Sequence, residues 1–169
     1  MTDETTAAAT RPAGANPDLA RGTGTTASAV APAAERPGAA DDGRDQVTVR
    51  MPAEGAYLSV LRTATAGLAA RLDFTLDEIE DLRIAVDEAC AMLLGQALPG
   101  SSLECSFTLG RDRMTISVSV PCLTPRVPAS DTFAWTVLSA LAGSVEAHAG
   151  PGDRLTIVMR KSRDSSRSV

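Results

Sequence analysis

Residues 103–120 contain two runs in which apolar and polar side chains alternate, separated by a short polar turn. The apolar members are Leu103, Cys105, Phe107 and Leu109 before the turn, and Met114, Ile116, Val118 and Val120 after it. Because successive side chains of a strand point to opposite faces, this alternation predicts a β-hairpin with one buried and one solvent-facing side. Such a hairpin is stable only when a second layer of structure covers its apolar side.

Two amphipathic helices are predicted before this hairpin. The first starts near Pro52, and its inward-facing stripe recurs at steps of three and four residues as Leu58, Leu61, Thr65, Leu68 and Leu72. The second has the stripe Ile79, Leu82, Val86, Ala89 and Leu93. Thr75 and Glu78 have the spacing of a capping box, which predicts that the second helix begins near Leu76 and ends before Pro99.

The regions flanking these elements carry further strand and helix patterns. Val47, Val49 and Met51 alternate with polar residues, which predicts a short strand before the first helix. Residues 121–130 hold three prolines and are predicted as a loop. Two final strands are predicted at about 144–148 and 154–161, around a turn at 150–153.

A third helix is predicted after the loop, because Ser130 and Asp131 can each accept hydrogen bonds as an N-cap. Its apolar face is predicted to consist of Phe133, Val137, Ala140 and Leu141, with Gly143 as the stop. The element order is then β-α-α-β-β-α-β-β. This order predicts the α+β class, as a two-layer α/β sandwich with one mostly antiparallel sheet covered on one face by three helices.

The N-terminal quarter of the chain differs sharply in composition from the rest. Residues 1–45 are dominated by Ala, Thr, Gly and Pro, have no aromatic residue, and carry seven acidic and four basic side chains. Such a segment cannot bury enough apolar surface to offset the entropy lost on ordering, so it is predicted to be a disordered leader. The predicted domain is 46–161, followed by a frayed tail at 162–169.

Charge and composition exclude several function classes. The formal net charge of -5 argues against direct nucleic-acid binding, which needs a clustered positive surface. No apolar stretch is long enough for a membrane helix and no signal-peptide pattern is present, so a cytoplasmic protein is expected. Cys90, Cys105 and Cys122 fit neither a disulfide framework nor a zinc motif and are predicted to be reduced and mostly buried. His148 is the only histidine and is predicted to be a strand residue, so no metal site is expected.

The second helix contains a recognisable motif. The segment Leu82–Cys90, LRIAVDEAC, resembles the nucleotide-binding helix of the GHKL (Bergerat) ATPase superfamily, and in particular its RsbW-like branch of anti-sigma-factor serine kinases. The segment Arg71–Ile79, RLDFTLDEI, is similar to the link between the first two helices of that family. The resemblance covers about residues 46–161 and agrees with the predicted order of elements.

The resemblance implies a nucleotide site that this sequence keeps only in part. Glu88 matches the glutamate that serves the family as general base. Four residues later the family has an asparagine that holds magnesium, and here that position is Met92, whose thioether is a poor ligand for a hard cation. Catalysis by Glu88 is therefore expected only if kinase activity persists. Its alternative interpretation is an ordinary acidic residue on the polar side of the helix.

The family's adenine and phosphate motifs are also replaced. The resemblance places Val120 at the aspartate that reads adenine, and Cys122 and Thr124 at the two following glycines. Ala134 stands where the phosphate lid has a glycine. These positions, with Met92, form the predicted degenerate nucleotide site. No cofactor is expected, and Mg-ATP would be needed only if the chain were an active kinase.

Candidate partner-binding residues lie on the two long helices. Arg62 corresponds to an arginine that the resembled family uses to contact both its sigma factor and its antagonist, and arginine is well suited to bidentate recognition of a carboxylate. The second helix is strongly acidic, which indicates either a solvated face or a charged partner surface. The predicted partner-binding set is Arg62, Leu58, Asp77, Glu78 and Asp81.

The resemblance implies three alternative functions. The first is an anti-sigma factor that sequesters a stress- or sporulation-type sigma factor and releases it to a STAS-domain anti-anti-sigma protein. The second is an active serine kinase that phosphorylates that antagonist. The third is an adaptor on the same fold with partners other than sigma factors. A homodimer is a further expectation from the family.

Overall fold

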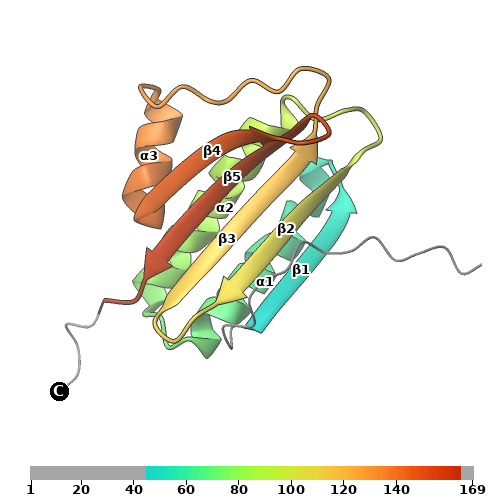
Figure 1. Ribbon diagram of the computed structural model, residues 1–169. Coiled ribbons are helices and arrows are strands. Elements are labelled where there is room, and N and C mark those ends of the chain that lie inside the picture. The colour runs from blue at the N-terminus through green and yellow to red at the C-terminus, as the bar shows by residue number, and fades with distance from the viewer. Residues whose placement is uncertain (1–44, 165–169) are drawn as a thin grey trace, which may run out of the picture. The chain divides into compact units, whose positions relative to one another are not determined.

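The structure is a computed structural model that describes residues 45–164 (Figure 1). Its elements are β1 (Asp45–Pro52), the short 3-10 helix η1 (Gly55–Tyr57), α1 (Leu58–Arg71), α2 (Leu76–Leu94), β2 (Ser102–Leu109), β3 (Arg113–Pro121), α3 (Phe133–Ala142), β4 (Ser144–Gly150) and β5 (Arg154–Ser162). The predicted order of strands and longer helices is confirmed, with η1 as the addition.

One five-stranded sheet has the spatial order β1-β2-β3-β5-β4, and every neighbouring pair is antiparallel. β2 and β3 form the predicted hairpin, with Phe107 opposite Ile116, and Ile116 lies opposite Met159 on β5. Figure 1 shows the three helices on one face of this sheet. The predicted α+β two-layer sandwich is therefore confirmed.

The core lies between the sheet and the helices. All eight apolar residues that alternate along β2 and β3 are buried, and Leu155, Ile157 and Met159 of β5 continue the same layer. From the helices, Leu61, Leu82 and Leu93 are fully buried against them. On the opposite side of the sheet, polar pairs such as Ser106 and Ser117 are partly exposed. The alternation in the sequence therefore reflects a sheet covered on one side only.

Two helix starts differ from the prediction. The first long helix begins at Leu58 rather than near Pro52, because residues 55–57 form the separate 3-10 turn η1. The N-cap of α3 is Thr132, whose hydroxyl accepts a hydrogen bond from the Trp135 backbone N–H at 3.2 Å, and not Ser130 or Asp131. Serine, threonine and aspartate all serve as N-caps, so composition alone did not distinguish among three consecutive candidates.

The predicted apolar face of α3 is wrong for Phe133 and Ala140, whereas Leu141 packs against the core as predicted. Phe133 is 84% exposed and Ala140 is also exposed, whereas Leu138 and Ala142 are the buried residues of this helix. Nearly every residue of α3 is apolar, so spacing alone did not define which side faces the core. Contact with α2 and β5 decides which side is buried.

The predicted leader lies outside the described residues, apart from Asp45, which begins β1. At the other end, the prediction of a frayed tail starts too early, because β5 includes Ser162. The backbone N–H of Arg163 donates to the backbone carbonyl of Asp112 at 2.8 Å, and that of Asp164 donates to the Glu78 side-chain carboxylate at 2.9 Å. Residues 165–169 lie outside the described part. No helix among the described residues is long and apolar enough to cross a membrane.

The three cysteines are free and buried, as predicted. Burial, with a smaller contribution from Asp87, raises the pKa of Cys90 to about 12. Burial likewise raises the pKa of Cys105. All three thiols are shielded by burial, and those of Cys90 and Cys105 also stay protonated, whereas the thiolate is the reactive form.

We therefore expect the native protein to react with Ellman's reagent at pH 8 at least about a hundredfold more slowly than the urea-unfolded protein. Absorbance at 412 nm during the reaction measures both rates. Rapid labelling of a full thiol equivalent in the native state would contradict the packing described for these cysteines.

Candidate functional site

The positions that resemble the family's nucleotide site lie along α2 and around the end of β3. α2 starts at the predicted capping box, in which the Thr75 hydroxyl accepts from the Glu78 N–H at 3.3 Å and the Glu78 carboxylate accepts from the Thr75 N–H at 2.7 Å. This capping box sets the first residue of α2. The position of every later residue around the helix follows from that start. Glu88 and Met92 follow on one side of α2, one turn apart.

Glu88 is partly exposed, as a general base would need to be. Met92, in contrast, is partly buried and packs against the hydrophobic core. Its side chain therefore fills space between the layers and offers no oxygen ligand to magnesium. The carboxylate that could act as base has no metal-binding partner at the family's position.

The end of β3, where the resembled family binds adenine, is apolar and buried. Val120 is fully buried, and Cys122 is almost fully buried. The Cys122 N–H donates to the Asp153 carbonyl at 2.8 Å, so the turn before β5 occupies this backbone donor. Thr124 is exposed in the following loop, and Ala134 is partly buried in the first turn of α3. These residues do not fit a magnesium–nucleotide complex.

The loop at 122–132 is held in place by hydrogen bonds from one glutamine side chain. The Gln96 amide nitrogen donates to the Arg126 carbonyl and the amide oxygen accepts from the Arg126 N–H, both at 2.9 Å. An open hollow of about 330 Å³ lies between residues 95–99 and Leu123, Thr124 and Arg126. Glu88 does not line this hollow.

Replacing Gln96 with alanine should free this loop, because two hydrogen bonds to one backbone unit are lost together. We expect hydrogen–deuterium exchange of the amides at 122–132 to become at least about tenfold faster, while exchange in β2 stays unchanged. Mass spectrometry of peptic peptides measures both regions. Unchanged exchange in the loop would mean that other contacts hold it.

Arg62 is the exposed member of an ion pair that joins the first two helices. Its side chain is 44% exposed, and its Nε donates to Asp87 Oδ2 of α2 at 2.5 Å. The other carboxylate oxygen, Asp87 Oδ1, is buried with no hydrogen-bond partner among the described residues. Leu58, four residues before Arg62, is partly buried and packs against the core.

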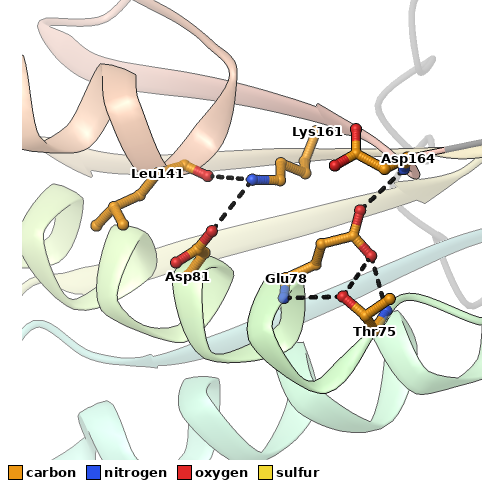
Figure 2. Close-up of polar contacts among 6 residues, drawn as sticks. All are labelled: Thr75, Glu78, Asp81, Leu141, Lys161 and Asp164. Carbon is orange, nitrogen blue, oxygen red and sulfur yellow. Dashed lines mark hydrogen bonds and ion pairs between the residues drawn. The ribbon is translucent and has the colours of Figure 1, made fainter. Parts of the chain in front are cut away.

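The acidic candidates on α2 have different environments, and Figure 2 shows those of Glu78 and Asp81. Asp77 is exposed. Glu78 is only 6% exposed, and its carboxylate accepts from Thr75 and from the Asp164 N–H, so it is used inside the domain. Asp81 is partly exposed and lies 3.4 Å from Lys161 Nζ, which also donates to the Leu141 carbonyl at 2.9 Å. The predicted partner-binding residues are thus not gathered on one open surface.

Sequence reasoning missed Asp87 and Gln96 as residues that organise the site. The short link at 72–75 makes α1 and α2 an antiparallel pair. Arg62 lies nine residues before the end of α1, and Asp87 lies eleven residues after the start of α2, so the two are within one helical turn of the same level. That approximate register makes Asp87 the nearest acidic candidate for an ion pair with Arg62. No sequence pattern connects Gln96 with Arg126, because their contact depends on the path of an irregular loop. In residues 45–164 no group of three or more His, Cys, Asp or Glu side chains could hold a metal ion.

Several known proteins to which this chain is similar share one name, RsbW. The chain is 37% identical over 89 residues to the anti-sigma-F factor RsbW of Mycobacterium tuberculosis, which covers 53% of each chain. It is 38% identical over 76 residues to the serine-protein kinase RsbW of Halalkalibacterium halodurans, covering 44% of this chain and 47% of the relative. For the serine-protein kinase RsbW of Bacillus subtilis the identity is 33% over 78 residues, covering 44% and 49%.

The chain spans about half the length of the curated relatives it matches. No family model matches it. All three relatives are bacterial and carry the same family name, and the five-stranded antiparallel sheet with helices on one face agrees with that relationship. Over the matched half, this chain is therefore similar to RsbW proteins, and its α+β sandwich is consistent with a fold of the GHKL type.

Proposed function

We propose that this protein is an anti-sigma factor that acts by binding alone. The observation that carries the proposal is the contrast between two regions of one fold. Where the resembled family binds nucleotide, this chain has the buried side chains of Val120 and Cys122 and the core-packed Met92. Where that family contacts its partners, Arg62 is exposed on α1. Similarity to an anti-sigma-F factor supports the same function.

The proposed mechanism is steric. A sigma factor that is bound to the exposed side of α1 and α2, around Arg62, cannot offer its bound surface to RNA polymerase. No chemical step is required. Release would come from a STAS-domain anti-anti-sigma protein that competes for this face. Complementary charge across such an interface sets partner choice and association rate. We place the protein in the cytoplasm, where sigma factors and RNA polymerase meet, and a homodimer remains part of the proposal.

A pull-down from the native cell tests the partner class directly. The full chain, tagged at its C-terminus, should recover a sigma factor and a STAS-domain protein, identified by mass spectrometry. Recovery of neither, with other proteins enriched reproducibly, would favour the adaptor alternative.

Arg62→Ala should weaken binding of the recovered sigma factor by about 1–3 kcal/mol, the usual cost of truncating an interface arginine. The free energy of unfolding should change by less than about 1 kcal/mol, because the ion pair with Asp87 is half exposed. Arg71→Ala is the matched control, since Arg71 lies on the same helix and forms an exposed ion pair with Asp45. Equal affinities of the Arg62 and Arg71 variants would remove Arg62 from the interface.

The kinase alternative rests on Glu88, which is partly exposed, and on relatives named serine-protein kinase. Under the binding-only proposal, calorimetric titration with magnesium-ATP should give no saturable heat below about 1 mM. Glu88→Ala should leave sigma binding unchanged, and radiolabelled phosphate should not pass to the STAS-domain protein. Transfer that is lost in Glu88→Ala would establish the kinase instead.

A further inference from the structure

The contact between Arg62 and Asp87 determines how the arginine is presented to a partner. Only the Nε of Arg62 is used, in its 2.5 Å hydrogen bond to Asp87 Oδ2. Neither terminal guanidinium nitrogen has a hydrogen-bond partner within residues 45–164. The two terminal nitrogens form one edge of the planar guanidinium, and that edge matches the two oxygens of a carboxylate.

Asp87 is anchored more firmly than Arg62. Its side chain is 31% exposed against 44% for Arg62, and its Oδ1 atom is buried. It also lies in the interior of α2, between the fully buried Val86 and the core residue Ala89. The position of the Asp87 carboxylate is therefore set by α2. The carboxylate in turn orients the longer Arg62 side chain.

An arginine without such a contact samples many rotamers, and ordering it on binding costs free energy. A fixed acceptor at Nε removes part of that cost before the partner arrives. The Asp87 contact leaves the two terminal nitrogens of Arg62 free for a partner carboxylate. Asp87 and the partner carboxylate therefore bind different nitrogens and do not compete.

We infer that Asp87 is a positioning residue for partner recognition: it holds the Arg62 guanidinium so that its two terminal nitrogens meet an aspartate or glutamate side chain on the partner protein. This inference rests on the proposed function, because Arg62 must lie in the interface. It adds that the partner presents an acidic residue there and that the affinity conferred by Arg62 depends on Asp87.

A double-mutant cycle tests the dependence. Affinities for the sigma factor recovered in the pull-down are measured for wild type, Arg62→Ala, Asp87→Ala and the double variant. Asp87→Ala should weaken binding about three- to tenfold when Arg62 is present and have no further effect in the Arg62→Ala background. Glu80→Ala, which breaks the neighbouring surface pair with Arg83 on the same helix, is the matched control and should change neither affinity.

A second measurement uses the free protein and does not depend on any partner. The Arg62 Nε–Hε signal in a nitrogen–proton NMR spectrum should exchange slowly with water in wild type and in Glu80→Ala. In Asp87→Ala it should exchange as fast as the signals of unpaired arginines. Asp87→Asn, which keeps an acceptor oxygen but loses the charge, should give intermediate exchange and intermediate affinity.

Three outcomes would overturn the inference. Equal losses of affinity from Asp87→Ala in both backgrounds would indicate a purely structural role, and tighter binding by Asp87→Ala would indicate competition. Unchanged Arg62 exchange in Asp87→Ala would show that Asp87 does not hold the guanidinium. Failure of the proposed function gives a different result, because then no sigma factor binds the wild-type protein. In that case the inferred recognition of a partner carboxylate is wrong, even if the NMR exchange of Arg62 is as expected.

Discussion

Phe107→Ala should lower the free energy of unfolding by about 3–5 kcal/mol, the usual cost of removing a fully buried aromatic ring. Phe107 has no exposed surface, and it lies in the second strand of the sheet, opposite Ile116. The helices cover this side of the sheet, so the cavity left by the ring cannot fill with water without separating the layers. Because small domains are stable by only about 5–15 kcal/mol, this change would remove a large part of the total.

Urea unfolding followed by circular dichroism measures this loss. Thr108→Ala is the matched control: Thr108 is the next residue of the same strand, is partly exposed on the other side of the sheet, and lies opposite Thr115. We expect the control to change the free energy of unfolding by less than about 1 kcal/mol. Similar effects of the two variants would mean that the sheet is not covered on one side as described.

The fold could be predicted from the sequence because its strands and its two long helices carry strong, mutually consistent patterns. The hairpin at 103–120 alternates without a break, and Thr75 with Glu78 begins α2 where the capping box predicts. α3 was harder, because a nearly uniform apolar helix has no clear stripe. Phe133, which is predicted to face the core, is exposed. Only the positions of α2 and β5 decide which side of α3 is covered.

The candidate site was predictable only where it depends on residue identity. The replacements at Met92 and Val120 are visible in the sequence, and the structure adds that these side chains pack into or against the core. The contacts of Gln96 with Arg126, 30 residues apart, and of Glu78 with Asp164, 86 apart, are tertiary. They depend on the paths of the loop at 122–132 and of the segment after β5 in the folded domain, so no local pattern predicts them.

Glu78→Gln should destabilise the domain by about 1–3 kcal/mol at pH 7, because one carboxylate serves three hydrogen-bond donors. Glu78 Oε2 accepts from the Thr75 N–H at 2.7 Å and from the Thr75 hydroxyl at 2.9 Å, and Oε1 accepts from the Asp164 N–H at 2.9 Å. Figure 2 shows this carboxylate joining the start of α2 to Asp164, two residues beyond the end of β5. A glutamine keeps one acceptor and brings an NH₂ group against the remaining donors.

The pKa of Glu78 gives this prediction a pH dependence. Burial raises that pKa, but the hydrogen bonds from the Asp164 and Thr75 backbones and from the Thr75 hydroxyl, together with the charge of Lys161, outweigh burial and leave it below 4.5. A carboxyl group whose pKa is lower in the folded state stabilises the fold at pH values above its unfolded pKa. That contribution is lost as the pH falls through the folded value, where the carboxylate becomes protonated in both states.

The difference in unfolding free energy between wild type and Glu78→Gln should therefore be largest at pH 6–8 and shrink as the pH falls below about 4.5. Urea unfolding of both proteins at about pH 7, 5 and 3.5 measures it. Asp77→Asn is the matched control, because Asp77 is the preceding acidic residue in the same helical turn and is exposed. A difference for Glu78→Gln that stays constant down to pH 3.5 would mean that the ionised carboxylate is not what holds Thr75 and Asp164, and that side-chain packing alone accounts for the loss.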